Sequence, residues 1–229
     1  FWDTFRAVHP LFTLLYPEVS ERVTQSILNA YDESGFMPEW ASPGHRECMI
    51  GNNSISLLTD AWMKGIRTIC PEKALEAMIH QTEARHPGIS SVGRDGFGYY
   101  DRLGYVPYPE VHEATAKTLE YAYADWCVAR FADSIGRKEI ADTYYRKALN
   151  YRNLYYPDYG FMWAKDANGK WRDAFDSTEW GGPFTEGSSW HWTWSVLHDP
   201  EGLSRLMGGH TAMEARLDSM FTAPNTYNY

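Results

Sequence analysis

Apolar residues recur at three- and four-residue steps along most of the chain, which is the period of an amphipathic helix. Residues 17–31, 53–65 and 71–83 show this pattern clearly. A proline opens the first and the third of these segments, and Asn53-Ser54 can cap the second. The pattern therefore predicts three helices in the first third of the chain.

The same period continues over about 110–134, where Gly136 ends it, and over about 138–151. Asp199-Pro200 is an N-cap followed by a proline in the first turn, which predicts a short helix that ends at Gly208-Gly209. Thr211-x-x-Glu214 has the spacing of a capping box and predicts the start of the last helix.

Strand signals are weak and local. Residues 159–163 and 170–172 flank the turn sequence Asp166-Ala167-Asn168-Gly169, which predicts one short β-hairpin. Long loops rich in glycine and proline separate the helices at 35–40, 93–109 and 181–189. We therefore expect an all-α fold, and helix pairs joined in this way can close into an (α/α) toroid whose loops line a cleft.

Charge, hydropathy and cysteine content argue against several classes of protein. The net charge is 21 − 30 = −9 and no basic tract is present, which argues against nucleic-acid binding. No segment reaches the ~18 apolar residues of a membrane helix. Cys48, Cys70 and Cys127 are too few for a disulfide framework, so we expect buried free thiols.

The stretch from Trp180 to Trp194 is the strongest candidate site, because Glu186 lies there at a glycine-flanked bend among aromatic residues. If Trp180, Phe184 and Trp190 wall the carboxyl, desolvation would let it hold a proton beside a sugar. The alternative is a glutamate that is stabilised by the dipole of a helix starting near Ser188. Both interpretations remain open on these residues alone.

Asp3 and Arg6 are one helical turn apart beside Trp2. They can form an (i, i+3) ion pair, or Asp3 can bind sugar hydroxyls next to the Trp2 ring. His191 and His198, seven residues apart, would lie two turns from each other on one helix and cannot share a metal ion. Four loop aspartates either serve a hard cation such as Ca²⁺ or are simply solvated: Asp95, Asp101, Asp173 and Asp176.

Several motifs in a fixed order resemble one family, glycoside hydrolase family 92, the calcium-dependent exo-acting α-mannosidases. The resemblance runs from end to end. The segments that carry it are Trp2-Asp3-Thr4-Phe5-Arg6, Gly35-Phe36-Met37-Pro38-Glu39-Trp40, Cys48-Met49-Ile50-Gly51, Gly104-Tyr105-Val106-Pro107, residues 118–126, Phe184-Thr185-Glu186-Gly187-Ser188-Ser189-Trp190, His198-Asp199-Pro200-Glu201-Gly202-Leu203 and Leu206-Met207-Gly208-Gly209.

The resemblance implies inverting removal of terminal α-linked mannose from glycans such as N-glycans or mannans, mostly by secreted or periplasmic bacterial enzymes. It implies Glu186 as the general acid and Asp3 as a mannose contact. We expect Trp2, Arg6 and Trp190 to be further substrate-binding residues. Ca²⁺ would bind the sugar hydroxyls O2 and O3. Residues 1–229 would form part of a single (α/α)₆-barrel catalytic domain, without the N-terminal β-sandwich domain and the C-terminal part of the barrel.

One departure from the family is large. The family's general base lies in a Gly-Asn-Asp-Asp-x-Gly-Gln segment, and the resemblance implies that an Asn-bearing segment soon after the last helix helps to hold the calcium. Neither segment occurs in these 229 residues. We therefore expect a chain that holds the acid without the base and is inactive by itself. The alternatives are a non-catalytic carbohydrate-binding helical domain and a helical scaffold for protein partners.

Overall fold

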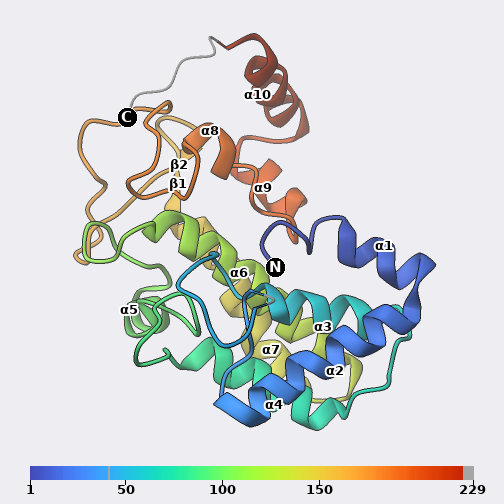
Figure 1. Cartoon of the computed structure of the whole chain (residues 1–229). Helices are drawn as coiled ribbons and strands as arrows, with labels where there is room; N and C mark the ends of the chain where they lie inside the picture. Colours follow the sequence, from blue (N-terminus) through green and yellow to red (C-terminus); the bar gives the residue numbers. More distant parts are fainter. Residues whose placement is uncertain (41, 224–229) are drawn as a thin grey trace. The chain divides into compact units, whose positions relative to one another are not determined.

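The computed structural model describes residues 1–40 and 42–223, and the fold there is almost entirely helical (Figure 1). The sheet within these residues has two strands, β1 (Tyr155–Tyr156) and β2 (Phe161–Met162). The helices are α1 (Val8–Leu15), α2 (Pro17–Ser34), α3 (Asn53–Met63), α4 (Pro71–Glu83), α5 (Phe97–Leu103), α6 (Ala114–Ser134), α7 (Lys138–Lys147), the 3₁₀ helix η1 (Ala148–Leu154), α8 (Ser189–Trp192), α9 (Pro200–Leu206) and α10 (His210–Thr222).

The chain forms two compact units, each described by itself below. The first unit comprises Phe1–Phe97 and Ala124–Ala148, and the second comprises Gly98–Tyr123 and Leu149–Tyr229. Helix α6 begins in the second unit and ends in the first. The all-α prediction and the helices predicted at 17–31 and 71–83 are confirmed.

Helix α3 is buried on every side rather than along one stripe. Its N-cap is Asn52, so the prediction that Asn53-Ser54 caps this helix is wrong. Both side chains are buried inside the first turn and bond elsewhere: Asn53 Nδ2 donates to the Ile50 oxygen at 3.0 Å, and Ser54 Oγ donates to Glu39 at 3.1 Å. A distant carboxylate therefore replaces the local cap.

Helix α6 starts at Ala114, about four residues later than the periodicity predicts. Glu113 has a left-handed backbone, with φ of 55°, which a regular helix does not accommodate. The backbone N–H groups of Thr115 and Ala116 donate to the Pro183 oxygen at 3.0 and 3.2 Å. The first turn of α6 is therefore bonded to the loop that carries Glu186.

The two-stranded sheet is a hairpin that lies earlier in the chain than the one predicted from residues 159–163 and 170–172. The antiparallel pairs are Tyr155 with Met162 and Tyr156 with Phe161. The turn around Asp166–Gly169 does form, closed by the Asp166 N–H donating to the Lys170 oxygen at 3.0 Å, but a single bridge follows it. Gly160, with φ of 73°, lies in the tight turn that joins β1 to β2.

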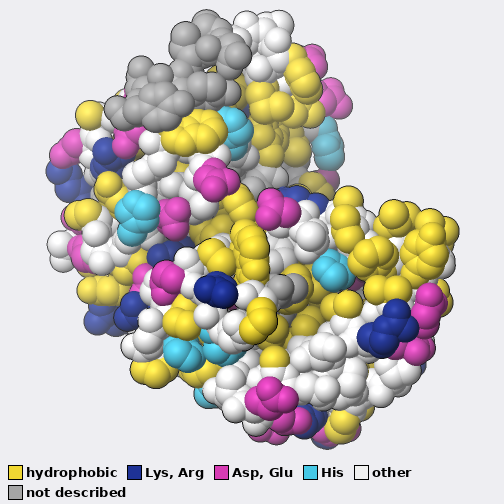
Figure 2. Space-filling view, viewed as in Figure 1, with side chains coloured by type: hydrophobic (Ala, Val, Ile, Leu, Met, Phe, Trp, Pro, Cys, Tyr) yellow, Lys and Arg dark blue, Asp and Glu magenta, His cyan; other side chains and the backbone are white. Residues whose placement is uncertain are grey.

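Helix α1 lies at the surface of the first unit and contains no buried residue. Figure 2 shows hydrophobic side chains gathered over this helix. The large exposed apolar side chains on and next to it are Val8, Leu11, Leu14, Leu15 and Tyr16. These side chains leave the apolar face of α1 open to solvent.

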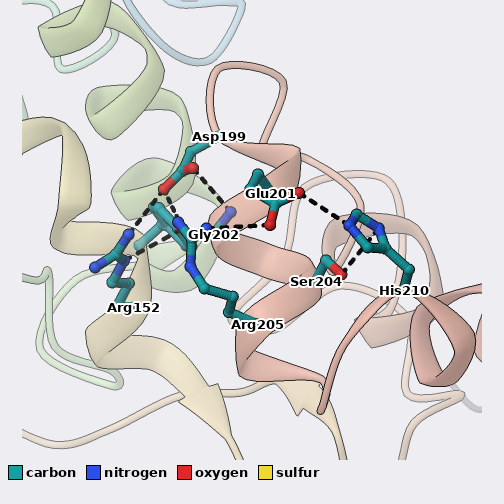
Figure 3. A network of polar contacts seen from close by, with 8 residues as sticks. Arg152, Asp199, Glu201, Gly202, Ser204, Arg205 and His210 are labelled. Carbon is teal, nitrogen blue, oxygen red and sulfur yellow. Dashed lines mark hydrogen bonds and ion pairs between the residues drawn. The ribbon is translucent and has the colours of Figure 1, made fainter.

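Asp199 organises the start of α9 as predicted (Figure 3). One carboxylate oxygen accepts from the Gly202 N–H at 2.8 Å, and the other accepts from Tyr151 Oη at 2.7 Å and Arg152 Nη2 at 2.9 Å. The next cap differs from the prediction, because α10 begins after Gly209 and Thr211 lies inside it without a capping bond.

The close packing around Gly202 predicts that a larger residue at this position destabilises the protein. A Cβ atom there would lie 2.0 Å from Asp199 Oδ2 and 2.4 Å from Tyr151 Oη, so Gly202→Ala must displace the Asp199 side chain. We expect a loss of about 1–3 kcal/mol of stability, seen as a lower melting temperature. Gly98→Ala, in α5 with open space around its Cβ position, is the control and should stabilise by about 0.4–1 kcal/mol. Equal melting of the two variants would contradict this account.

Candidate active site

The Glu186 loop, residues 181–189, is tied to itself and to α6. The Gly181 N–H donates to the Gly187 oxygen at 2.8 Å, and the Phe184 N–H donates to the Gly181 oxygen at 3.0 Å. The Pro183 oxygen accepts from the first turn of α6, as described above. Both ends of the loop therefore meet, and its middle is anchored on the longest helix.

Glu186 has a left-handed backbone, with φ of 45°, and its side chain is exposed. A left-handed residue other than glycine is strained, and such strain is concentrated at functional sites. Its neighbours are fixed: the Thr185 oxygen accepts from Trp192 Nε1 at 2.8 Å, and a Cβ atom on Gly187 would lie 3.2 Å from His191 Cβ. The loop thus presents an accessible carboxylate from a pinned backbone.

The aromatic rings near Glu186 in the sequence pack against other side chains of the second unit. Phe184 is 1% exposed and lies 6.0 Å from the Trp163 ring, while Trp190 meets Phe161 edge-on at 4.8 Å. The expectation that Trp180, Phe184 and Trp190 desolvate Glu186 is therefore wrong for the described residues. Glu186 is exposed, whereas Phe184 is buried and the half-buried Trp180 and Trp190 pack on His191 and Phe161.

His191 closes the start of α8. The Ser188 N–H donates to His191 Nδ1 at 3.1 Å, so the neutral ring carries its proton on Nε2. Burial lowers the pKa of His191, which favours this neutral form. The expected helix start near Ser188 is confirmed, but His198 lies beyond this four-residue helix and shares no face with His191.

The second group of predicted residues lies in the first unit, in the turns of residues 2–7. The Arg6 guanidinium carbon lies 4.7 Å from the centre of the Phe5 ring and 5.9 Å from that of Trp2. Asp3 is exposed and lines a cavity of about 720 Å³. Trp2, Asp3 and Arg6 therefore share one segment of the first unit, whereas Glu186 and Trp190 belong to the second.

The Asp3 cavity combines apolar walls with a few polar groups. One wall is the apolar face of α2, formed by Val19, Val23, Ile27 and Ala30. His9 and His45 also line it, and burial lowers the pKa of both, so both imidazoles are neutral at neutral pH. The volume is in the usual range for small-molecule sites.

Two residues of this cavity region were not singled out by sequence reasoning. Trp40 lines the cavity and is 43% exposed, and Glu39 beside it is 2% exposed. The available signal was the glycine-delimited segment 35–40, which places a proline, an acid and an indole side by side in a loop. The partners of Glu39 lie 15 and 42 residues away in the sequence, so no local pattern predicts them.

The loop aspartates do not gather into a cation site in the described part of the chain. Asp95 pairs with Arg85 at 3.2 Å, Asp173 pairs with Lys170 at 2.8 Å, and Asp176 accepts from the Thr178 hydroxyl at 2.7 Å. Within residues 1–40 and 42–223, no three His, Cys, Asp or Glu side chains could hold a metal ion together. These residues do not fit a calcium centre by themselves.

A helical scaffold that presents accessible carboxylates and aromatic rings points to the carbohydrate-active proteins as the class for comparison. The family model described as the glycosyl hydrolase family 92 catalytic domain matches residues 1–228. The chain belongs to glycoside hydrolase family 92.

Solved relatives share this fold, and the chain matches about a third of their length. A family 92 inverting mannosidase from Bacteroides thetaiotaomicron VPI-5482 is 83% identical with a TM-score of 0.95, over 100% of this chain and 31% of that protein. A family 92 α-mannosidase from Bacteroides thetaiotaomicron, solved with mannoimidazole, is 32% identical with a TM-score of 0.90, over 99% of this chain and 30% of that protein.

A curated relative from Arthroderma benhamiae, described as an uncharacterized secreted glycosidase, is 27% identical over 84% of this chain and 29% of its own length. In the part of this chain that the structure describes, no helix has both the length and the apolar character needed to cross a membrane.

Proposed function

We propose that this chain carries the acid half of the active site of an exo-α-mannosidase. In this proposal the enzyme removes terminal α-linked mannose, with inversion, from glycans such as N-glycans or mannans. Family membership and the 83% identity to a protein described as an inverting mannosidase support it. The observation in the structure that carries the acid assignment is Glu186, an exposed carboxyl on a strained and pinned backbone.

Each proposed residue has one task. Glu186 donates its proton to the glycosidic oxygen as the bond to the leaving sugar breaks. Asp3 accepts hydrogen bonds from mannose hydroxyls, with Trp2 and Arg6 beside it, and the Trp190 ring contacts the substrate in the second unit. A pinned backbone suits the acid, because a misplaced proton donor loses much of its rate advantage.

Inversion also needs a second carboxylate about 6.5–9.5 Å from the acid to activate water. We propose that this base is not among the 229 residues, because the family's Asp-Asp segment does not occur in their sequence. The chain alone would then bind sugar without cleaving it. Ca²⁺ is part of the proposal through the resemblance, as a Lewis acid on the sugar hydroxyls, and the enzyme would work in the periplasm or after secretion.

The second candidate is a non-catalytic carbohydrate-binding domain. The Asp3 cavity favours it, because it offers carboxylates, an indole ring and apolar walls without needing a base. A sugar could bind there through hydroxyl contacts and ring stacking alone.

Mannose release separates the two candidates. A longer protein containing this sequence should release mannose from α-mannobiose, with the β-anomer appearing first by NMR, and should lose activity in EDTA and regain it with Ca²⁺. The 229-residue chain should bind the disaccharide in calorimetry without releasing mannose. Binding without release by the longer protein would favour the carbohydrate-binding domain. Initial α-mannose would contradict inversion, and full activity in EDTA would remove Ca²⁺ from the proposal.

A further inference from the structure

Glu39 is a buried carboxyl between α2 and α3 in the first unit, and the proposed reaction does not use it. Its Oε1 accepts from Gln81 Nε2 at 2.9 Å and from Ser54 Oγ at 3.1 Å. Its Oε2 accepts from the Ser54 N–H at 3.3 Å, in the first turn of α3. A carboxylate at this position receives support from the N-terminal end of the helix dipole.

Gln81, which is 0% exposed on α4, extends the same network to the backbone. Its Oε1 accepts from the Met37 N–H at 3.1 Å, and its Nε2 donates to the Met37 oxygen at 3.2 Å as well as to Glu39. The two side chains therefore clamp the Glu39 loop, residues 36–40, against α3 and α4. The amide of Gln81 cannot turn over without losing both bonds to Met37.

The clamp is connected to two residues that line the cavity, Asp3 and Trp40. The backbone nitrogen of Phe1 donates a hydrogen bond to the backbone oxygen of Glu39. This bond joins the segment that bears Asp3 to the Glu39 loop. Pro38 and Trp40, on either side of Glu39, line the Asp3 cavity. Glu39 itself is turned inward, since both of its carboxylate oxygens bond to interior groups.

Keeping an ionisable group in this place is costly. Burial raises the pKa of Glu39 to about 7, although the Phe1 ammonium and the hydrogen bonds from Ser54 and Gln81 oppose the shift. The loop could be packed with a neutral side chain at lower desolvation cost. A carboxylate, however, accepts all three hydrogen bonds at once, which no neutral side chain of that shape does.

We propose that Glu39 is a positioning residue for sugar binding: its carboxylate holds residues 37–40 so that Trp40 and Asp3 contact the same bound sugar. This rests on the proposed function, because it requires that the Asp3 cavity takes a sugar. Trp40 supplies the ring face and Asp3 supplies the hydrogen-bond acceptor, while Glu39 sets the relation between them without touching the ligand.

The first test compares Glu39→Gln with the wild-type chain by calorimetry with α-mannobiose at pH 8. The glutamine amide must point an N–H at one of the donors that Glu39 now accepts from, so the clamp loses at least one hydrogen bond. We expect about a tenfold loss of affinity. Hydrogen exchange should be faster at the Met37 and Ser54 amides. Glu21→Gln, the same charge change on the exposed side of α2, should alter neither measurement.

The second test is the pH profile of affinity between pH 5.5 and 8.5. Wild-type affinity should rise through an inflection near 7 as Glu39 ionises, and Glu39→Gln should lack that inflection. Both proteins share the other charged and titratable groups around Glu39 and its cavity, which are the Phe1 ammonium, Asp3, His9, Arg22, Glu33, His45 and Cys48. The Phe1 ammonium interacts directly with Glu39, so its titration also changes in Glu39→Gln, and a loss of the inflection is read for the two groups together.

Several outcomes would overturn the proposed positioning role of Glu39. Unchanged affinity in Glu39→Gln would overturn the proposal, and so would faster amide exchange without a loss of affinity, because Glu39 would then have only a structural role. If Glu39→Gln fails to fold, Ser54→Ala keeps the carboxylate, removes one donor and should weaken binding two- to threefold; unchanged affinity there overturns the proposal. If the wild-type chain binds no sugar, the proposed role of the cavity fails before any variant is compared.

Discussion

Replacing Glu186 with glutamine should slow the release of mannose from natural glycans by about 10²–10⁴-fold in an active enzyme that contains this chain. Glutamine keeps the size of the side chain and cannot donate the proton that the departing sugar oxygen needs. An activated aryl mannoside leaves with little protonation, so the same variant should lose much less activity on it. The measurement is kcat on α-mannobiose and on such an aryl mannoside, for wild type and variant.

Glu201→Gln is the matched control, because it makes the same change in the second unit on an exposed residue that pairs with Arg205 and His210 (Figure 3). We expect its kcat within about twofold of wild type on both substrates, since exposed ion pairs contribute little. If Glu186→Gln lost activity equally on both substrates, Glu186 would not be the general acid. The strained backbone would then need a different explanation.

The helices were the most predictable part of this chain, because their signals are local. Prolines at the first turn predicted the starts of α2, α4 and α9, and glycines predicted several ends. The errors came where tertiary bonds replaced local ones. Glu39 rather than Asn53 or Ser54 serves the first turn of α3, and the Glu186 loop sets the start of α6.

The candidate site was predictable as a set of residues but not as an environment. Glu186 was identified in its glycine-flanked loop, yet its exposure depends on a left-handed backbone and on rings that pack elsewhere, such as Phe184 on Trp163. Desolvation is a property of the surrounding chain, which a sequence stretch of fifteen residues does not determine. Glu39 escaped notice for the same reason, because its partners come from two distant helices.

Breaking a buried ion pair should strongly destabilise the first unit. Arg94 is 1% exposed and Asp125, on α6, is 0% exposed, with Nη1 and Oδ1 2.8 Å apart. Arg94 Nε also donates to Asn52 Oδ1 at 2.8 Å, just before α3. Asp125→Asn would leave the guanidinium buried beside a neutral amide, and breaking one partner of such a pair costs about 3–5 kcal/mol. The melting temperature should fall by roughly 6–20 °C for a chain of this size.

Two comparisons test whether the loss of stability in Asp125→Asn arises because the ion pair is buried. Asp60→Asn removes the partner of Lys64 from an exposed pair that is also 2.8 Å long, and it should cost less than about 1 kcal/mol. Replacing both Arg94 and Asp125 with apolar residues of similar size should cost less than Asp125→Asn alone, because no uncompensated charge then remains in the core. Equal melting of Asp125→Asn and Asp60→Asn would show that water reaches Arg94 in solution. The link between the loop before α5 and helices α3 and α6 would then depend on packing rather than on charge.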